Sequence, residues 1–378
     1  MKRGIYIVIG IAVILLILVG SRAQKGDSSV IKIGSISALT GTGSPIGQEE
    51  RNGALLAVEQ INSRGGIMGK RIELVSEDLS FDNLKRAPAI ASKLSDVDQV
   101  HAIVGPQWDE PTEATMPYLE KSKIPTVGGD VTRNIERDKS YEYLFSTWYD
   151  NRSGIRKLLS YAKQAKLNNV AIIRPVDGGF WKFTADLFVR HAPEYGIKII
   201  DDVSLSDPFT TDYRTTLTKI GAENPDAIFI VVTDPTQCPF MKQAKELGIK
   251  AKILGTEASG SYASLAACGD LLTNLYFSTP APTDASNAFN AAYEKRFGKK
   301  PQYPSAVTAY DAVGVIAAAL RKTDSARGEV LRDAIASTKS YKGASLDEIT
   351  FDTQGYSITP ESAWGLQTVR QGAFVKAD

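Results

Sequence analysis

The sequence predicts an α/β protein built from two doubly wound, Rossmann-like lobes. Strand-like and helix-like segments alternate from residue 30 onward, which is the pattern of parallel sheets covered by helices on both faces. Residues 227–232 read AIFIVV, a run that is apolar on both strand faces and is typical of a central parallel strand. The length of 378 residues exceeds what one domain usually holds, and it indicates two such sheets.

The first half of the chain gives the clearest periodic signals. Leu55, Val58 and Ile61 recur at three-residue spacing and mark the buried face of a helix, which the glycines at 65 and 66 end. Asp82 is expected to cap the helix that follows. The predicted strands are 30–36, 71–76, 100–104 and 124–127, and the predicted helices are 46–64, 82–94 and 110–122.

The same alternation returns in the second half. Tyr310, Val313, Ala317 and Leu320 mark one further amphipathic helix. The predicted strands are 170–173, 197–203, 227–232 and 252–255, and the predicted helices are 181–194, 211–221 and 237–248.

The N-terminus is typical of an exported protein. Lys2 and Arg3 precede the 17 uncharged residues 4–20, and small residues follow at 21 and 23. This pattern predicts a signal peptide over residues 1–23. An uncleaved N-terminal anchor is the alternative, although the apolar stretch is shorter than the roughly 20 residues of a full span.

Composition excludes several function classes. Lys and Arg total 44, Asp and Glu total 43, and no basic block supports nucleic-acid binding. Two cysteines and two histidines leave little material for a metal centre, so we expect no metal and no cofactor. Cys238 and Cys268 either form a disulfide after export or are small buried residues. The glycine loop 41–47 lacks the spacing of a nucleotide-binding turn.

Ligands of parallel sheets bind outside the carboxyl ends of the strands. The loops expected there are 37–48, 105–111, 128–134, 174–181, 233–237 and 255–261. They carry unusual acidic and aromatic side chains, namely Trp108, Asp109, Asp130, Trp181, Asp234 and Glu257. Paired acids can serve a hydrolase, but nothing in the sequence distinguishes an acid from a base among these residues.

Residues 35–78, SISALTGTGSPIGQEERNGALLAVEQINSRGGIMGKRIELVSED, resemble the start of the leucine/isoleucine/valine-binding protein family, the type I periplasmic receptors of ABC importers. Asn62, Gly65, Gly66, Ile67 and Gly69 match the family's I-N-x-x-G-G-I-x-G pattern, and an acidic pair follows at 77–78. AIVGP, KIPTVG and DAIFIVVTDP extend the resemblance almost to the C-terminus.

The resemblance implies two lobes joined by a three-crossing hinge that closes around a ligand. The implied crossings lie near 147–151, 278–283 and 342–348. Lobe 1 would comprise 30–148 plus 281–344, and lobe 2 would comprise 149–280 plus 345–378. The implied protein is a periplasmic monomer that presents a small molecule to an ABC transporter permease and performs no catalysis.

The resemblance also implies a set of ligand contacts. Glu257 in LGTEAS matches a family glutamate that holds the ligand's ammonium group, and the alternative is that Glu257 caps a helix. Trp108, Phe180 and Trp181 either stack on the ligand or a cation, or pack the lobes together. The full predicted set is Ile46, Trp108, Asp109, Gly129, Asp130, Thr132, Phe180, Trp181, Thr233, Asp234 and Glu257.

One departure from the family pattern concerns the ligand's carboxylate. Asp109 stands about where the family has a serine hydroxyl, and an ionised Asp109 would repel a carboxylate. Either Asp109 points away and the N-terminus of helix 110–122 holds the carboxylate, or the acids face inward and the ligand carries an amine, an amide or hydroxyls. We therefore expect a receptor for an amino acid or an amine- or amide-bearing relative. A sensory receptor without transport and a secreted enzyme are the alternatives.

Overall fold

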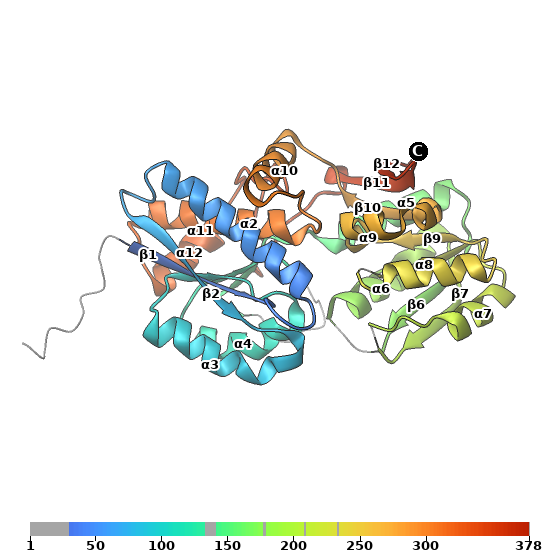
Figure 1. Cartoon of the computed structure of the whole chain (residues 1–378), viewed down its shortest axis with the longest axis horizontal. Helices are drawn as coiled ribbons and strands as arrows, with labels where there is room; N and C mark the ends of the chain where they lie inside the picture. The colour runs from blue at the N-terminus through green and yellow to red at the C-terminus, as the bar shows by residue number, and fades with distance from the viewer. Residues whose placement is uncertain (1–29, 133–140, 177–178, 208, 233, 378) are drawn as a thin grey trace, which may run out of the picture.

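Two sheets lie side by side along the long axis of the molecule, each with its own helices (Figure 1). The computed structural model describes residues 30–132, 141–176, 179–207, 209–232 and 234–377. The predicted signal peptide at 1–23 and the predicted contact Thr233 lie outside these residues. Within the described ranges, no helix is both long and apolar enough to cross a bilayer.

The first sheet is parallel throughout and has the strand order β2-β1-β3-β4-β5. Its strands are β1 (Val30–Ser37), β2 (Arg71–Asp78), β3 (Ala102–Val104), β4 (Thr126–Gly128) and β5 (Leu144–Ser146). Because the strands run in one direction, the loops after their carboxyl ends meet at one edge of the sheet.

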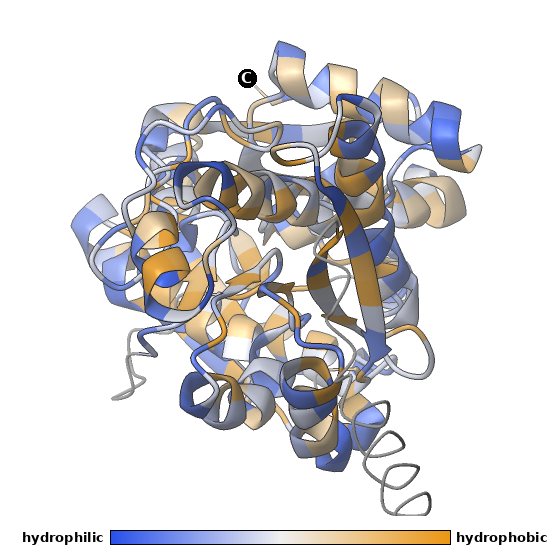
Figure 2. Cartoon of the chain, turned by 90° about the vertical axis from the view of Figure 1, so that its left-hand side faces the viewer, coloured by the Kyte–Doolittle hydropathy of each residue, from blue (hydrophilic) through white to orange (hydrophobic). Residues whose placement is uncertain are grey.

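Helices cover both faces of the first sheet. Ile33 and Val104 belong to the core shared with α2, α11 and α12, whereas Ile36 and Ile103 belong to the core shared with α3 and α4. Figure 2 shows the hydrophobic residues gathered on the strands and on the helix faces turned toward them. The helical segments of this part are α2 (Ser44–Ser63), η1 (Phe81–Arg86), α3 (Ala87–Ser92), η2 (Lys93–Val97), α4 (Asp109–Lys121), α10 (Asp284–Phe297), α11 (Ser305–Lys322) and α12 (Gly328–Ala336).

The second sheet is mixed and has the order β12-β11-β10-β9-β8-β6-β7. Its parallel strands are β6 (Asn169–Pro175), β7 (Lys198–Leu205), β8 (Ala227–Ile230), β9 (Lys252–Gly255) and β10 (Leu275–Pro280). Two antiparallel strands extend one edge, β11 (Trp364–Arg370) and β12 (Ala373–Lys376). Ile172 and Ile173, successive residues of β6, belong to different cores, so both faces of this sheet are buried as well.

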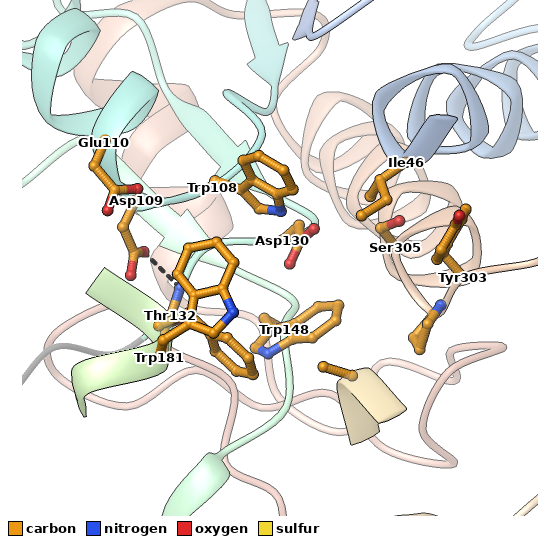
Figure 3. A pocket seen from close by; sticks show the side chains of 13 residues that line it. Ile46, Trp108, Asp109, Glu110, Asp130, Thr132, Trp148, Trp181, Tyr303 and Ser305 are labelled. Carbon is orange, nitrogen blue, oxygen red and sulfur yellow. Dashed lines mark hydrogen bonds between the residues drawn. The ribbon is translucent and has the colours of Figure 1, made fainter. Parts of the chain in front are cut away.

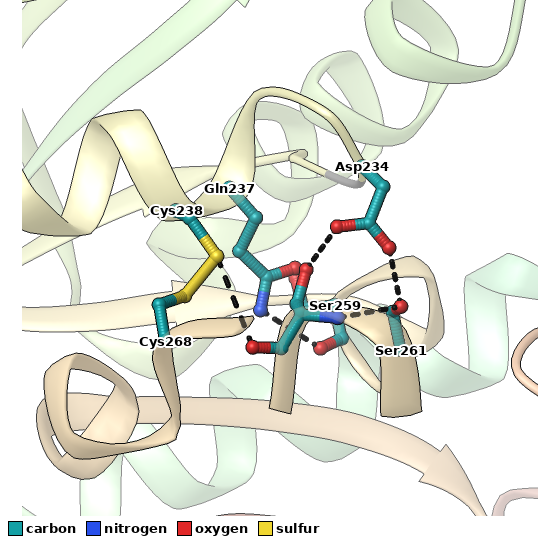
Figure 4. The surroundings of a disulfide bond; sticks show 7 residues. Asp234, Gln237, Cys238, Ser259, Ser261 and Cys268 are labelled. Atoms are coloured by element: carbon teal, nitrogen blue, oxygen red, sulfur yellow. Dashed lines mark hydrogen bonds between the residues drawn. A yellow bond between two sulfur atoms is a disulfide. The ribbon is translucent and has the colours of Figure 1, made fainter. Parts of the chain in front are cut away.

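The second sheet carries its own set of helices. They are α5 (Asn151–Gln164), α6 (Gly179–His191), η3 (Ala192–Tyr195), α7 (Arg214–Ala222), α8 (Gln237–Glu246), η4 (Glu257–Ser259), α9 (Tyr262–Cys268), η5 (Gly269–Asn274) and η6 (Glu361–Ala363). Cys238 of α8 and Cys268 of α9 form a disulfide (Figure 4), so the first of the two alternatives for these cysteines is confirmed.

The two doubly wound sheets confirm the predicted fold class, but one predicted helix start is wrong. Asp82 caps no helix, because its carboxylate accepts hydrogen bonds from the backbone N–H and the hydroxyl of Thr42 at 2.7 and 2.9 Å. Residues 81–86 form a 3₁₀ segment instead, and the α-helix begins only at Ala87, with Pro88 in its first turn. The acid therefore fixes the glycine loop before α2.

The chain passes between the two sheets at three places. It leaves β5 at Ser146 and enters α5 at Asn151, and it leaves β10 at Pro280 and enters α10 at Asp284. The predicted third crossing, 342–348, does not match the contacts of the segment that follows. Residues 355–357 still bond to Ser146 of the first sheet, and Phe351 packs 5.6 Å from Phe145. We therefore propose a third crossing at 358–363 and assign 345–357 to lobe 1.

Asn62 ties the end of α2 to β2. Its side-chain amide donates to the carbonyl of Ile72 and accepts from the N–H of Ile72, both at 2.8 Å. Replacing Asn62 by alanine leaves two backbone groups without these partners, so we expect the free energy of unfolding to fall by about 1–3 kcal/mol in denaturant titrations. Ser63→Ala, at the exposed neighbouring position, is the control. An Asn62→Ala protein as stable as that control would contradict the assignment.

Candidate ligand-binding site

A pocket lies between the two lobes, at the carboxyl edges of both sheets, and encloses about 570 Å³ including the solvent at its mouth. Its lining side chains come from α2, from α4, from the loops after β3, β4 and β5, and from α6, η4 and the start of α11, and most of them are labelled in Figure 3. The lining residues are Ile46, Trp108, Asp109, Glu110, Asp130, Thr132, Trp148, Phe180, Trp181, Ala258, Tyr303, Pro304 and Ser305.

Seven predicted contacts meet in this pocket, namely Ile46, Trp108, Asp109, Asp130, Thr132, Phe180 and Trp181. They come from segments up to 135 residues apart in the sequence, since the set runs from 46 to 181. These residues follow the carboxyl ends of different strands, and the fold brings them together at one pocket.

Three described residues of the predicted set do not line this pocket. Gly129 faces α11, where an added Cβ would lie 2.8 Å from the backbone nitrogen of Ala309. Asp234 turns toward α9 and accepts hydrogen bonds from the hydroxyls of Ser261 and Ser264; its bond with Ser261 is drawn in Figure 4. Glu257 lines a second cavity, which shares Tyr303 and Pro304 with the first.

Six lining residues were missed by the sequence analysis. Trp148 follows β5, a strand of three residues that is too short to give a periodic signal. Tyr303, Pro304 and Ser305 stand at the start of α11, where the sequence marked only the helix body from 310 onward. Glu110 and Ala258 directly follow the predicted contacts Asp109 and Glu257. The two adjacent aromatic residues at 148–149 were the sequence signal that could have identified Trp148.

Asp109 and Glu110 form the contact between α4 and the second lobe. The backbone N–H of Thr132 donates to Asp109 at 2.9 Å, and the backbone N–H of Gly179, at the start of α6, donates to Glu110 at 2.9 Å. A Cβ added at Gly179 would lie 2.6 Å from the Cβ of Asp109, so the two lobes touch here. Both acids also stand in the first turn of α4, the position where negative charge is favourable.

Asp130 lies at the centre of a cluster of acids. Burial raises its pKa to about 8, with further contributions from the charges of Asp109 and Glu257. Burial also raises the pKa of Glu257 to about 7, partly offset by hydrogen bonds that include Asn151 at 2.5 Å. The pKa of Glu50 lies well above its ordinary value because the carboxyl is buried and faces Asp130, with the Ser37 hydroxyl opposing the shift. Asp130 is therefore mostly protonated at neutral pH, and Glu257 is partly protonated there.

Aromatic rings form much of the pocket wall. Trp108 of the first lobe meets Trp181 of the second edge to face, with ring centroids 6.0 Å apart. Trp181 also contacts Phe180 at 6.1 Å and Phe209 at 5.5 Å. Trp108 has a φ of 66°, in the left-handed region that bulky side chains rarely adopt. Such strain is a common property of binding sites, where the surroundings hold an unfavourable backbone in place.

The acid cluster predicts an unusual dependence of stability on pH. Asp130, Glu257 and Asp311, whose pKa burial raises to about 6, titrate higher in the folded protein than in the unfolded chain. The folded state therefore binds more protons between about pH 4 and 8, and its stability falls as the pH rises through that range. We expect the ligand-free melting temperature to be lower at pH 8.5 than at pH 5.5. Asp130→Asn should flatten this slope in calorimetry, and an unchanged slope would contradict the prediction.

Comparisons with known proteins agree with this architecture. The periplasmic binding protein family matches residues 30–373. The leucine-, isoleucine-, valine-, threonine- and alanine-binding protein of Pseudomonas aeruginosa is 25% identical over 324 residues, covering 84% of this chain and 85% of the relative.

Solved structures share the fold. LivJ, the branched-chain amino acid transporter substrate binding protein of Streptococcus pneumoniae, in complex with isoleucine, superimposes with a TM-score of 0.80 at 25% identity, covering 92% of this chain and all of LivJ. A Rhodopseudomonas palustris solute binding protein in complex with 3,4-dihydroxybenzoic acid gives 0.80 at 22% identity, covering 92% and 96% of the two chains. With two hinged α/β lobes, a pocket between them and a family match over nearly the whole described chain, this protein belongs to the periplasmic binding protein family.

Proposed function

We propose that this protein is an extracytoplasmic substrate-binding protein, which captures one small polar solute between its lobes and delivers it to the membrane permease of an ABC transporter. The observation that carries the proposal is the pocket itself, which takes its walls from both lobes and lies at the carboxyl edges of both sheets. Such a pocket can be opened and closed by a hinge, because a movement of the lobes separates its two walls.

The proposed solute is an amino acid or a relative that carries an amine or amide group. The Pseudomonas relative is named for binding five amino acids, and an ammonium group is common to all of them. Glu257 is the proposed partner of that group. Its carboxyl is buried, bonded to Asn151, and placed in the cavity that adjoins the main pocket. A buried cation needs such a paired and hydrogen-bonded anion.

The proposed place of action is the periplasm, which the protein would reach through the predicted signal peptide 1–23. There it would act as a monomer, bind its solute without changing it chemically, and present the closed, loaded form to the permease. The solute is the proposed small-molecule partner, and neither a cofactor nor a nucleic acid is part of the proposal.

The proposal is tested by a thermal-shift screen over amino acids, amides, amines and aromatic acids, followed by X-ray scattering and mass spectrometry. Ligand at one hundred times its dissociation constant stabilises the folded state by about 2.7 kcal/mol, so a hit raises the melting temperature visibly. We expect one solute class to do so, to contract the scattering profile, and to be recovered unchanged. Contraction by no solute would overturn the proposal, and turnover of a bound solute would indicate an enzyme instead.

A further inference from the structure

We propose that residues 299–303 of the first lobe form a latch, which holds the two lobes closed by bonding to Asp234 and to the start of α9 in the second lobe. Glu49 of α2 is the positioning residue of this latch. The inference rests on the proposed function and deepens it, because it assigns residues that determine how long the lobes stay closed around a solute. It also gives a role to Asp234, a predicted contact that does not line the main pocket.

The latch segment joins two helices of the first lobe and meets the second lobe through its backbone. It lies between α10, which ends at Phe297, and α11, which begins at Ser305. The N–H of Tyr262, the first residue of α9, donates to the carbonyl of Gln302 at 3.2 Å. The first N–H groups of a helix have no partner within their own helix, so this donor can bond to the other lobe. Opening of the lobes must break this bond.

Tyr303 reaches the second lobe with its side chain. Burial raises the pKa of its phenol, and so do the negative charge of Asp234 and the hydrogen bond between the two groups. A hydrogen bond with Ser261 opposes this rise in pKa. Ser261 and Ser264 also donate to Asp234, so the carboxylate is already fixed within the second lobe. A hydrogen bond to an ionised acceptor is roughly twice as strong as one between neutral groups, so this contact should contribute more to closure than the backbone bond does.

Glu49 holds the latch segment in place on the first lobe. Its side chain is buried on α2, accepts the backbone N–H of Gln302 at 2.7 Å and pairs with Lys299 at 2.8 Å. Pro301 and Pro304 restrict the backbone on either side of Gln302. A segment that is ordered beforehand loses little conformational freedom when it binds. Its bonds to the second lobe therefore remain as net stabilisation of the closed form.

The latch and the contact at α4 lie on opposite sides of the pocket. Figure 3 shows Tyr303 on one side and Glu110 on the other, and Glu110 accepts the N–H of Gly179 from the second lobe. The lobes are therefore joined on both sides of the ligand space. A solute can leave only after the lobes separate, so the latch should slow the release of any solute, whatever contacts that solute makes itself.

The first experiment traps the closed form by chemistry and needs no solute. The double variant Tyr262→Cys/Gln302→Cys places two thiols beside the interlobe bond and keeps both of its backbone groups. A short bis-methanethiosulfonate joins the two thiols only when the lobes are closed. The two native cysteines are bonded to each other, so the introduced thiols are the ones that react. We expect peptide mapping to find the crosslink between 262 and 302. A folded double variant that reacts at both thiols without forming this crosslink would overturn the proposal.

The second measurement follows the open form. Exchange of the Tyr262 N–H with deuterated water requires that its bond to Gln302 is broken, because the first amide of a helix lacks a helical partner. The exchange rate therefore rises with the population of open protein, whereas the crosslinking rate rises with the population of closed protein. Wherever the equilibrium lies, at least one of the two rates must respond to a change in the stability of the closed form.

The variant Tyr303→Phe tests the side-chain part of the latch. It removes the hydroxyl next to Asp234 and keeps the ring that lines the pocket. We expect slower crosslinking, faster exchange or both, by at least about threefold. Tyr310→Phe is the matched control, because the Tyr310 hydroxyl bonds to Gln60 within the first lobe at 2.8 Å. If both rates in Tyr303→Phe equal those of the control, the latch assignment is wrong.

The variant Glu49→Gln tests the positioning role. It removes the charge that pairs with Lys299, and Glu59→Gln is the matched control, because Glu59 stands on the same helix and pairs with Arg296 at 2.7 Å. We expect the two rates to change in the same direction as in Tyr303→Phe, and the effects of the two variants to combine less than additively. A merely structural defect would lower the melting temperature and leave both rates unchanged. That outcome would remove Glu49 from the latch.

Failure of this inference is distinguishable from failure of the proposed function. If a solute contracts the scattering profile while the latch variants leave both rates unchanged, the receptor function stands and the latch falls. If the two rates respond as expected but no solute of any class contracts the protein, the latch stands as a contact between the lobes and the receptor function falls.

Discussion

Replacing Gly179 by valine should weaken solute binding by at least about tenfold and hold the two lobes apart. Gly179 begins α6 of the second lobe at the place where that lobe meets α4 of the first. An added Cβ would lie 2.4 Å from the Oδ2 atom of Asp109, 2.6 Å from its Cβ and 2.9 Å from its Cγ. Contacts this short cannot be relieved by rotating the end of a flexible side chain, because the Cβ of Asp109 is fixed by the helix backbone.

Asp109 has little freedom to move away. It is 2% exposed, stands in the first turn of α4 and accepts the N–H of Thr132. The least costly response is therefore a small opening of the lobes, which also lengthens the bond from Gly179 to Glu110 and separates Trp108 from Trp181. Because the pocket takes its walls from both lobes, opening removes one wall from the ligand, and the loss of binding follows from that geometry.

The measurement is calorimetric affinity for any solute that stabilises the wild type, together with X-ray scattering of the loaded protein. Gly269→Val is the matched control, because a Cβ added at Gly269 finds its nearest neighbour at an ordinary 3.6 Å. Gly179→Ala should give an intermediate effect. A Gly179→Val protein that binds and contracts like the control would show that the lobes do not need this close approach.

The parts of the fold that the sequence predicted are those with long, regular patterns. The spacing of Leu55, Val58 and Ile61 located α2, and the apolar run at 227–232 located β8 in the interior of its sheet. The strands β5 and β10 and the antiparallel pair β11 and β12 were missed. A strand of three residues gives no period, and a sheet edge formed by the returning C-terminus depends on contacts between residues far apart in sequence.

The sequence predicted which loops meet at the pocket better than it predicted which side chains point into it. Loops at strand ends placed Trp108, Asp130 and Trp181 together correctly. The same rule also selected Asp234, but local hydrogen bonds to Ser261 and Ser264 turn its carboxylate toward α9. Whether a carboxylate points into the pocket or bonds to a neighbouring hydroxyl depends on distances of a few ångström. The order of residue types in a sequence does not give these distances.

Removing the disulfide should lower the stability of the second lobe substantially. Cys238 and Cys268 are 30 residues apart, and the chain-entropy account of a loop of that length gives about 3–4 kcal/mol. The closed loop contains β9 and η4, and therefore Ala258 of the main pocket and Glu257 of the adjoining cavity. The bond thus holds together a segment that also forms part of the candidate site.

The double variant Cys238→Ser/Cys268→Ser is the suitable test, because a single replacement leaves a reactive thiol. We expect its free energy of unfolding in denaturant to be about 3–4 kcal/mol below that of the oxidised wild type. Reduced wild type should match the variant, and the reductant should leave the variant unchanged. Hydrogen bonds from Gln237 to Ser259 and from Ser259 to Val232 still connect α8, η4 and the loop after β8, so the variant should fold and bind its solute with a moderate loss of affinity. Equal stability of the oxidised wild type and the variant would mean that these packing contacts alone fix the segment.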